Sequence, residues 1–155
     1  MKTYRFRVSI IGIPRLYRII EASEDCTFDD FHDAIFHAFE RFDEHLYSFF
    51  ITRKDTRDSQ TIYDAPEITH PMNAKNLTRF EKKKKPASSI QIGDVGLKEK
   101  DVFHYLFDFG DDWWHRIMVQ NISETMPKKN HIKLIKSVGE SPPQYPEFDE
   151  DEEFE

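Results

Sequence analysis

The chain has 155 residues, a length typical of one domain with one hydrophobic core. Hydrophobic residues make up 38% of the chain and aromatic residues 14%, including fourteen Phe, which excludes a largely disordered body. Seven of the 29 acidic residues lie in residues 147–155, and the remaining 22 match the 22 Lys and Arg. The net charge of -7 therefore identifies no partner for the folded body.

The cysteine count and the pattern of apolar residues indicate where the protein works. Cys26 is the single cysteine, so a disulfide-stabilised secreted scaffold is excluded. The first residues alternate charged and ring-bearing side chains, unlike a signal peptide, and no apolar stretch is long enough to span a membrane. We expect a cytoplasmic protein without membrane association, with a single domain over residues 1–146 and a disordered acidic tail over residues 147–155.

The first third of the chain predicts a hairpin followed by a helix. Apolar and polar residues alternate over residues 4–10 and again after Gly12, so we predict an antiparallel hairpin over residues 3–21. Thr27 and Asp30 then have the spacing of a capping box, and apolar residues follow at helical spacing. This predicts a helix over residues 27–41.

The middle of the chain shows less regular patterns. A third strand is predicted over residues 46–53, where rings and Ile are frequent. Residues 54–89 have no sustained period and contain three prolines, so we predict a mobile loop region. The run Lys82, Lys83, Lys84 and Lys85 lies in it and is compatible with a nucleic-acid contact, although we favour a solvated loop because the body has no net charge.

Three further strands are predicted in the last third, over residues 102–108, 113–122 and 131–138. Together these elements predict an α+β fold. Its sheet is mostly antiparallel, with a long helix of the N-terminal half packed on one face, plus a long irregular insertion.

The densest group of chemically distinctive residues lies at residues 108–115, which read Asp-Phe-Gly-Asp-Asp-Trp-Trp-His. A turn of two or four residues at Gly110 pairs Asp108 with Trp113 and Leu106 with His115. Because side chains alternate along strands, Asp108 and His115 then become diagonal neighbours on one sheet face.

A carboxylate beside an imidazole can fix the histidine tautomer, raise its pKa or bind a metal. The candidate functional cluster consists of Asp108, Asp111, Asp112, Trp113, His115, His32 and His45. Within it, Asp108 and His115 are the candidate metal ligands, and no particular cofactor is indicated. The alternative, which we favour, is structural: acids at a turn cap backbone amides, and tryptophans pack the sheet.

Two blocks of the chain resemble the plasmid pRiA4b open-reading-frame-three-like family. Residues 27–49 are similar to its Leu-His helix and the His-Leu-Tyr-x-Phe strand that follows. Residues 105–115 are similar to its Tyr-x-Tyr-Asp-Phe-Gly-Asp-x-Trp-x-His motif, with Phe107 at the second aromatic position. The usual Pro-Pro-Glu-Asp ending is replaced by Pro-Pro-Gln-Tyr-Pro at residues 142–146. The resemblance implies an α+β fold and a link to plasmids or transposable elements, and it implies no established activity.

These observations favour a non-enzymatic interaction or accessory protein with a protein partner and a recognition surface around residues 108–115. One alternative is a metal-dependent hydrolase or nuclease that uses Asp108, Asp111, Asp112 and His115. A second is a nucleic-acid-binding module that uses the lysine run and aromatic stacking.

Overall fold

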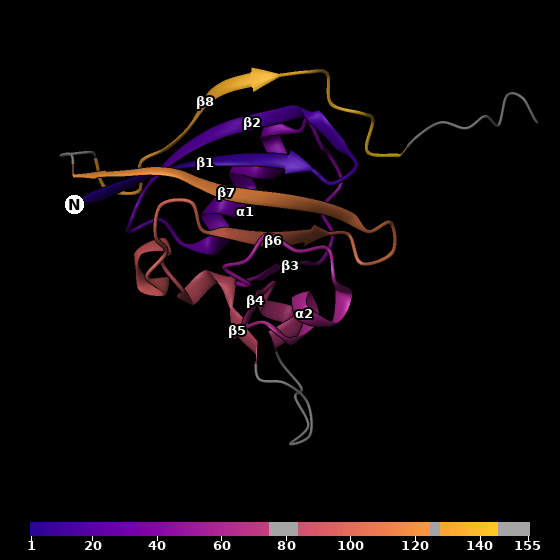
Figure 1. The fold of residues 1–155 in the computed structure, drawn as a ribbon, viewed down its shortest axis with the longest axis horizontal. Helices are drawn as coiled ribbons and strands as arrows, with labels where there is room; N and C mark the ends of the chain where they lie inside the picture. The colour runs from indigo at the N-terminus through magenta and orange to yellow at the C-terminus, as the bar shows by residue number, and fades with distance from the viewer. Residues whose placement is uncertain (75–83, 125–127, 146–155) are drawn as a thin grey trace, which may run out of the picture.

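The computed structural model describes residues 1–74, 84–124 and 128–145. In this part of the chain, eight strands form one sheet with the order β5-β4-β3-β6-β7-β1-β2-β8 (Figure 1). The strands are β1 (Lys2–Ile10), β2 (Ile13–Ser23), β3 (Tyr47–Phe50), β4 (Glu67–Thr69), β5 (Lys84–Pro86), β6 (Val102–Phe107), β7 (Trp113–Glu124) and β8 (Ile132–Val138). Neighbouring strands are antiparallel except β4 and β5, which are parallel, so the sheet is mixed.

The N-terminal hairpin is confirmed. Strands β1 and β2 pair in antiparallel fashion from Thr3–Ser23 to Ser9–Tyr17, and Gly12 forms the turn with a φ of 99°. This φ lies in the left-handed region, which glycine adopts without strain. The other side of β1 pairs with β7 and the other side of β2 with β8, so both strands are internal to the sheet and the hairpin turn lies beside the start of β7.

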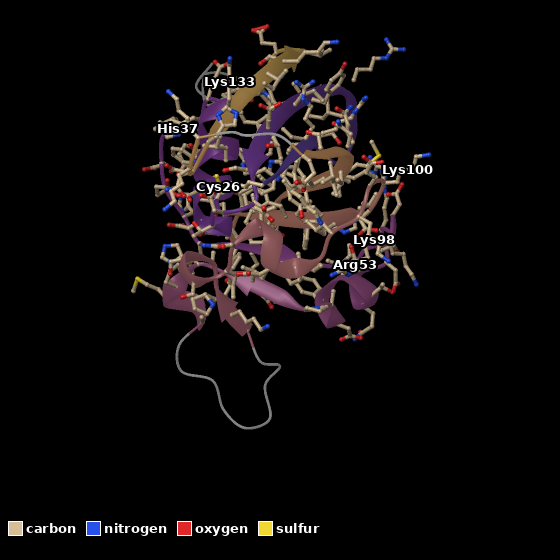
Figure 2. The ribbon with its side chains drawn as sticks, turned by 90° about the vertical axis from the view of Figure 1, so that its left-hand side faces the viewer. Cys26, His37, Arg53, Lys98, Lys100 and Lys133 are labelled. Carbon is tan, nitrogen blue, oxygen red and sulfur yellow. The ribbon has the colours of Figure 1, made fainter. Side chains whose placement is uncertain are left out.

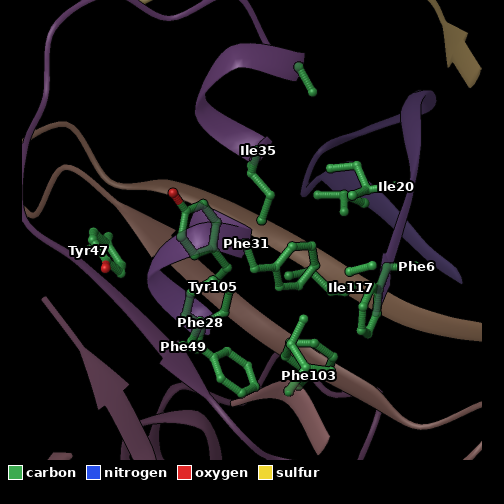
Figure 3. Packing of buried hydrophobic residues seen from close by; sticks show 14 of the residues in the cluster. Phe6, Ile20, Phe28, Phe31, Ile35, Tyr47, Phe49, Phe103, Tyr105 and Ile117 are labelled. Atoms are coloured by element: carbon green, nitrogen blue, oxygen red, sulfur yellow. The ribbon is translucent and has the colours of Figure 1, made fainter. Parts of the chain in front are cut away.

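Helix α1 (Phe28–Ala38) packs its apolar side on the sheet. The predicted capping box is present: Asp30 N donates to Thr27 Oγ1 at 3.0 Å, and Thr27 N donates to Asp30 Oδ2 at 2.9 Å. Figure 3 shows Phe28, Phe31 and Ile35 pointing at rings and branched side chains of the strands. The rings of Phe6 and Phe31 are 4.6 Å apart, so stacked and tilted phenylalanines fill the space between helix and sheet.

The predicted α+β fold with a long helix and an irregular insertion is wrong. The described residues form mainly a large mixed sheet, and their two α-helices are α1, with 11 residues, and α2 (Ser59–Asp64), with six. Helix α1 ends before residue 41 because Glu40 adopts a left-handed φ of 57°. The predicted extension to residue 41 counted apolar residues that belong to the following loop.

The predicted irregular insertion contains regular elements. Besides α2, it holds β4, β5 and the 3-10 helices η1 (Pro71–Ala74) and η2 (Ala87–Ser89), and a further 3-10 helix, η3 (Ile92–Val95), follows. Strands of three residues are too short to show a period in sequence, and all three residues of β4 are buried. Residues 75–83 lie outside the described residues, as do residues 125–127 and the predicted acidic tail.

Figure 2 views the end at which β6 begins, where Arg53, Lys98 and Lys100 are labelled. The turn between β6 and β7 lies at the other end of the sheet (Figure 1). Within the described residues, no helix is both long enough and apolar enough to cross a membrane.

Candidate functional site at the β6–β7 turn

The turn between β6 and β7 is organised by the first aspartate of the predicted cluster. Asp108 Oδ1 accepts hydrogen bonds from Gly110 N at 3.1 Å and Asp111 N at 3.2 Å. The backbone closes the turn because Asp112 N donates to Asp108 O at 2.7 Å. Asp108 and Asp112 adopt left-handed φ values of 69° and 54°, which aspartate tolerates better than most residues. The favoured structural role of an acid that caps turn amides is therefore present at Asp108.

The predicted pairing of β6 with β7 is wrong by one residue. Phe107 pairs with Trp113 and Tyr105 pairs with His115, because the turn has five residues rather than two or four. A shift of one residue exchanges the faces on which side chains lie. His115 consequently shares the α1-covered face with Tyr105, while Leu106 and Trp114 pack with Phe50 on the opposite face.

His115 is fully buried and bonded through both ring nitrogens. Arg41 Nη2 donates to His115 Nε2 at 2.9 Å, and His115 Nδ1 donates to the carbonyl oxygen of Tyr105 at 3.2 Å. Since arginine is only a donor, His115 Nε2 must be the acceptor and the ring is neutral. Burial, together with the nearby guanidinium, holds the pKa of His115 well below its ordinary value.

Arg41, which sequence reasoning missed, connects the turn to the core. It is 6% exposed, and its guanidinium carbon lies 5.1–5.3 Å from the ring centroids of Phe39, Phe107 and Trp113. Burial lowers its pKa to about 10. Among the described residues, Arg41 Nη1 and Trp113 Nε1 have no hydrogen-bond partner. No sequence period marks Arg41, because it follows the end of α1 in an irregular loop.

Asp108 has His45, rather than His115, as its histidine neighbour. Asp108 Oδ2 lies 3.5 Å from His45 Nε2, and the same nitrogen donates to Tyr145 Oη at 2.7 Å. Tyr145 Oη in turn donates to Asp43 Oδ2 at 2.8 Å. The hydrogen bond to Asp43 is the main reason that the pKa of Tyr145 rises to about 12, and the charges of Asp108 and Asp111 add to it.

The remaining predicted histidine, His32, forms a separate buried network. Tyr105 Oη donates to His32 Nδ1 at 2.6 Å, and His32 Nε2 donates to Glu44 Oε1 at 2.9 Å. The imidazole stacks on the Tyr47 ring with centroids 3.8 Å apart, and burial lowers the His32 pKa to about 4. His32 is therefore a neutral, fully bonded core residue at neutral pH.

Asp108 and His115, the predicted metal ligands, have separate partners in the structure. His115 has no free ring nitrogen and lies beside a guanidinium, whereas Asp108 Oδ1 is bonded within the turn and Asp108 Oδ2 lies 3.5 Å from His45 Nε2. No cluster of three or more His, Cys, Asp or Glu suited to a metal occurs among the described residues. The geometry thus does not assemble Asp108, Asp111, Asp112 and His115 around one point, and the metal pair stays a prediction from sequence.

The lysine run lies elsewhere. Lys84 and Lys85 belong to edge strand β5 and pair with Glu67 and Ile68 of β4, far across the sheet from the β6–β7 turn. Lys82 and Lys83 lie outside the described residues. The nucleic-acid contact through this run also stays a prediction.

An open groove of about 630 Å³ lies beside the turn. Its lining combines branched, aromatic and acidic side chains: Ile10, Ile11, Ile13, Asp111, Asp112, Trp113, Trp114 and Tyr145. A neighbouring hollow of about 420 Å³ shares Ile11, Asp112 and Trp114 with it and is further lined by Arg57, Ser59, Ile62 and Tyr63. The groove, which we call the turn groove, is formed where the β1–β2 turn meets the start of β7, since Ile11 N donates to Trp114 O at 2.9 Å.

Comparison with known proteins adds a family and a fold. The family model described as plasmid pRiA4b ORF-3-like protein matches residues 2–145. No sequence among curated proteins matches the chain. The crystal structure of a protein of unknown function from Methanosarcina mazei Go1 has a TM-score of 0.69 at 22% identity, covering 92% of this chain and 73% of that chain. At this identity, the likeness shows a shared fold.

Proposed function

Because the chain belongs to the plasmid pRiA4b ORF-3-like family, whose description names no reaction, we propose a function from the site itself: recognition of a partner polypeptide through the turn groove. The observation that carries this proposal is the groove's lining, in which three isoleucines, two tryptophans and a tyrosine surround a concave surface. Concave apolar surfaces rich in aromatic side chains are typical of binding sites. The plasmid origin of the family description favours a partner connected with mobile elements.

Exposed apolar side chains around the groove support the same proposal. Ten large hydrophobic side chains are exposed in the described part of the chain, and half of them lie at this end: Ile13, Phe42, Leu46, Phe109 and Tyr145. Phe42 is 71% exposed, and its ring centroid lies 5.8 Å from that of Tyr145. The preceding residue, Arg41, is buried. Single exposed apolar residues are common on protein surfaces, but several of them clustered beside a groove are typical of an interaction surface.

The bonding of the predicted cluster also favours recognition over catalysis by that cluster. The polar atoms of His115 and Asp108 are used to hold the turn, Arg41 and His45 in place. A site whose polar groups are bonded to one another presents a rigid surface, which lowers the entropy lost on binding. In this proposal, Asp108 and His115 support a binding surface.

The proposal is tested by selecting short random peptides on the immobilised protein and measuring the affinity of the selected peptides by calorimetry. The variant Ile13→Gln makes the groove lining polar, and the matched control Leu134→Gln changes an equally exposed residue of β8. We expect Ile13→Gln to raise Kd about tenfold through lost apolar contact, while Leu134→Gln leaves Kd unchanged. Failure to enrich any peptide, or equal losses in the two variants, would refute the proposal.

A further inference from the structure

The acidic side chains of the turn groove define the chemistry of its occupant. We propose that the groove binds a lysine or arginine side chain of the partner polypeptide, with the charged head near Asp111 and Asp112 and the methylene stem on the isoleucines. This inference rests on the proposed function and specifies the partner. It is carried by charge complementarity between the groove and a long basic side chain.

The charge of the lining has one sign. Asp111 and Asp112 are the charged residues among the lining residues, and both are exposed. Neither forms an ion pair with any residue that the structure describes. Asp43 and Asp108 extend the acidic character, since both act with Asp111 on the hydroxyl of Tyr145. A cation that enters the groove therefore meets carboxylates that have no cation of their own.

The apolar part of the lining suits the rest of a basic side chain. Lysine and arginine carry methylene stems that pack on apolar surface while their charged heads stay near water or a carboxylate. Ile10, Ile11 and Ile13 offer such a surface along one side of the groove. A hydrated metal ion would leave these isoleucines exposed to water and would gain nothing from them.

Aromatic rings beside Asp112 provide a second source of attraction for the head group. Trp113 and Trp114 line the groove beside Asp112. The Trp114 ring is held by Tyr63 and Phe50, which lie outside the groove lining with ring centroids 5.7 Å from that of Trp114. The faces of tryptophan rings beside a carboxylate favour an ammonium or guanidinium through cation–π attraction. The protein already uses this chemistry on the inner side of the groove, where Arg41 lies over Trp113.

The distribution of charge over the molecule argues against a phosphate-bearing occupant. Arg53, Lys98 and Lys100 lie at the opposite end of the sheet (Figure 2). A nucleic acid would have to place its phosphates beside the two carboxylates of the groove, which costs Coulomb energy. Arg57 does not line the turn groove; it lines the neighbouring hollow and another hollow that it shares with Arg116. The basic side chain of the partner is therefore placed in the turn groove and not in these hollows.

The first experiment examines the peptides that are selected on the wild-type protein. We expect each to contain a lysine or arginine, and replacement of that residue by norleucine, which keeps the stem and removes the charge, to raise Kd about tenfold. The variant Asp111→Asn with Asp112→Asn should raise Kd to a similar extent. Measuring the norleucine peptide against the Asp111→Asn, Asp112→Asn variant should raise Kd little beyond either change alone, because both changes remove the same interaction.

A matched variant controls for net charge. Asp33→Asn with Glu99→Gln removes two negative charges away from the groove, and the glutamine at residue 99 can still accept the bond from Ile122 N. We expect this control to leave Kd unchanged at physiological ionic strength. Asparagine keeps the size of aspartate and its tolerance of the left-handed φ at residue 112, so the groove variant should melt like the wild type.

The outcomes separate the two proposals. Peptides that bind the groove but carry no basic residue, or whose Kd is insensitive to Asp111→Asn with Asp112→Asn, would overturn the cation inference and leave polypeptide recognition intact. A total lack of enriched peptides would overturn both. Titration with capped lysine, capped norleucine, spermidine and Mg²⁺, followed by amide chemical shifts at residues 10–13 and 111–114, gives an independent measurement. Equal or stronger shifts with spermidine or Mg²⁺ than with capped lysine would contradict a polypeptide side chain.

Discussion

Arg41 and His115 show how a buried polar pair organises this protein at the residue scale. Arg41 Nη2 donates to a neutral histidine, not to a carboxylate, and three aromatic rings surround its guanidinium. A buried charge without a carboxylate depends strongly on its few hydrogen bonds. The pair therefore fixes the start of β7 against the loop that follows α1.

Double-mutant cycles test whether Arg41 or Asp108 is the residue coupled to His115 in stability. We expect Arg41→Met and His115→Gln to couple by about 1–3 kcal/mol in unfolding free energy, because they remove the two ends of one buried bond. Asp108→Asn and His115→Gln share no bonding partner and should couple by less than about 0.5 kcal/mol. Urea unfolding of the single and double variants measures both. Strong coupling between residues 108 and 115 would restore the pair that the sequence predicted.

The buried histidines should make stability depend on pH. Burial lowers the pKa of His32 from 6.5 to about 4, and the pKa values of His104 and His115 are lowered too. On acidification the unfolded chain therefore takes up protons before the folded protein does. We expect the contribution of His32 to be complete above pH 6.5 and to be lost between pH 6.5 and about 4, at about 1.4 kcal/mol per pH unit. His104 and His115 should add losses of the same sign on acidification.

The variant His32→Gln isolates one proton of this effect. Glutamine cannot titrate, so one proton fewer should be taken up on unfolding between pH 6.5 and 4. The slope of unfolding free energy against pH should fall accordingly, by about 1.4 kcal/mol per pH unit. The pKa of Glu44, raised by burial, contributes with the opposite sign, so the difference between wild type and variant is the quantity to compare. Identical slopes would show that His32 is protonated as readily in the fold as in the unfolded chain.

At the element scale, the short strand β4 extends the sheet by joining β5 to β3. Strand β4 has three residues, yet it pairs with β3 on one side and with β5 on the other. Its residues are all buried, and Ser48 Oγ donates to Glu67 Oε2 at 2.6 Å. The region that the sequence predicted as one mobile loop therefore contains an internal strand of the sheet.

Hydrogen exchange resolves this region residue by residue. A mobile loop over residues 54–89, as the sequence predicted, would exchange fast throughout. From the structure we expect slow exchange in β4 and fast exchange in residues 54–58, which precede α2. Strand β6 and residues 114–120 of β7 should be the slowest, because neighbouring strands bond them on both sides. Exchange in β4 as fast as in residues 54–58 would mean that this strand opens separately from the rest of the sheet.

At the scale of the whole molecule, the last described residues fasten the sheet to the loop after α1. Gln144 is 2% exposed; its side-chain oxygen accepts from Phe42 N and Asp43 N, and its nitrogen donates to Asp43 O. Ser141 Oγ adds a bond to Phe39 O at 2.8 Å. These contacts support the predicted single domain over residues 1–146, which stays a proposal.

Two variants separate this fastening from the acidic residues that follow. Truncation after Pro146 removes seven acids that repel one another and should change the melting temperature by less than about 2 °C. Gln144→Ala should instead cost about 1–3 kcal/mol, because it removes a buried amide and its three hydrogen bonds to the backbone of residues 42 and 43. Differential scanning calorimetry of the truncated protein and of Gln144→Ala compares their melting temperatures with that of the wild type. A truncation as costly as Gln144→Ala would show that the acidic tail supports the fold.

The sequence by itself determined the N-terminal hairpin, the start of α1, the strands around residues 102–107 and 113–122, and the family, because periodicity, capping and turn residues are local signals. Only the tertiary structure decided the register at the β6–β7 turn, the end of α1 and the partners of the predicted site. Arg41 and His115 are 74 residues apart in the chain, and His45 and Tyr145 are 100 apart. Contacts over such separations leave no local pattern, so Asp108 and His115 acquire different partners only when the sheet brings distant loops together.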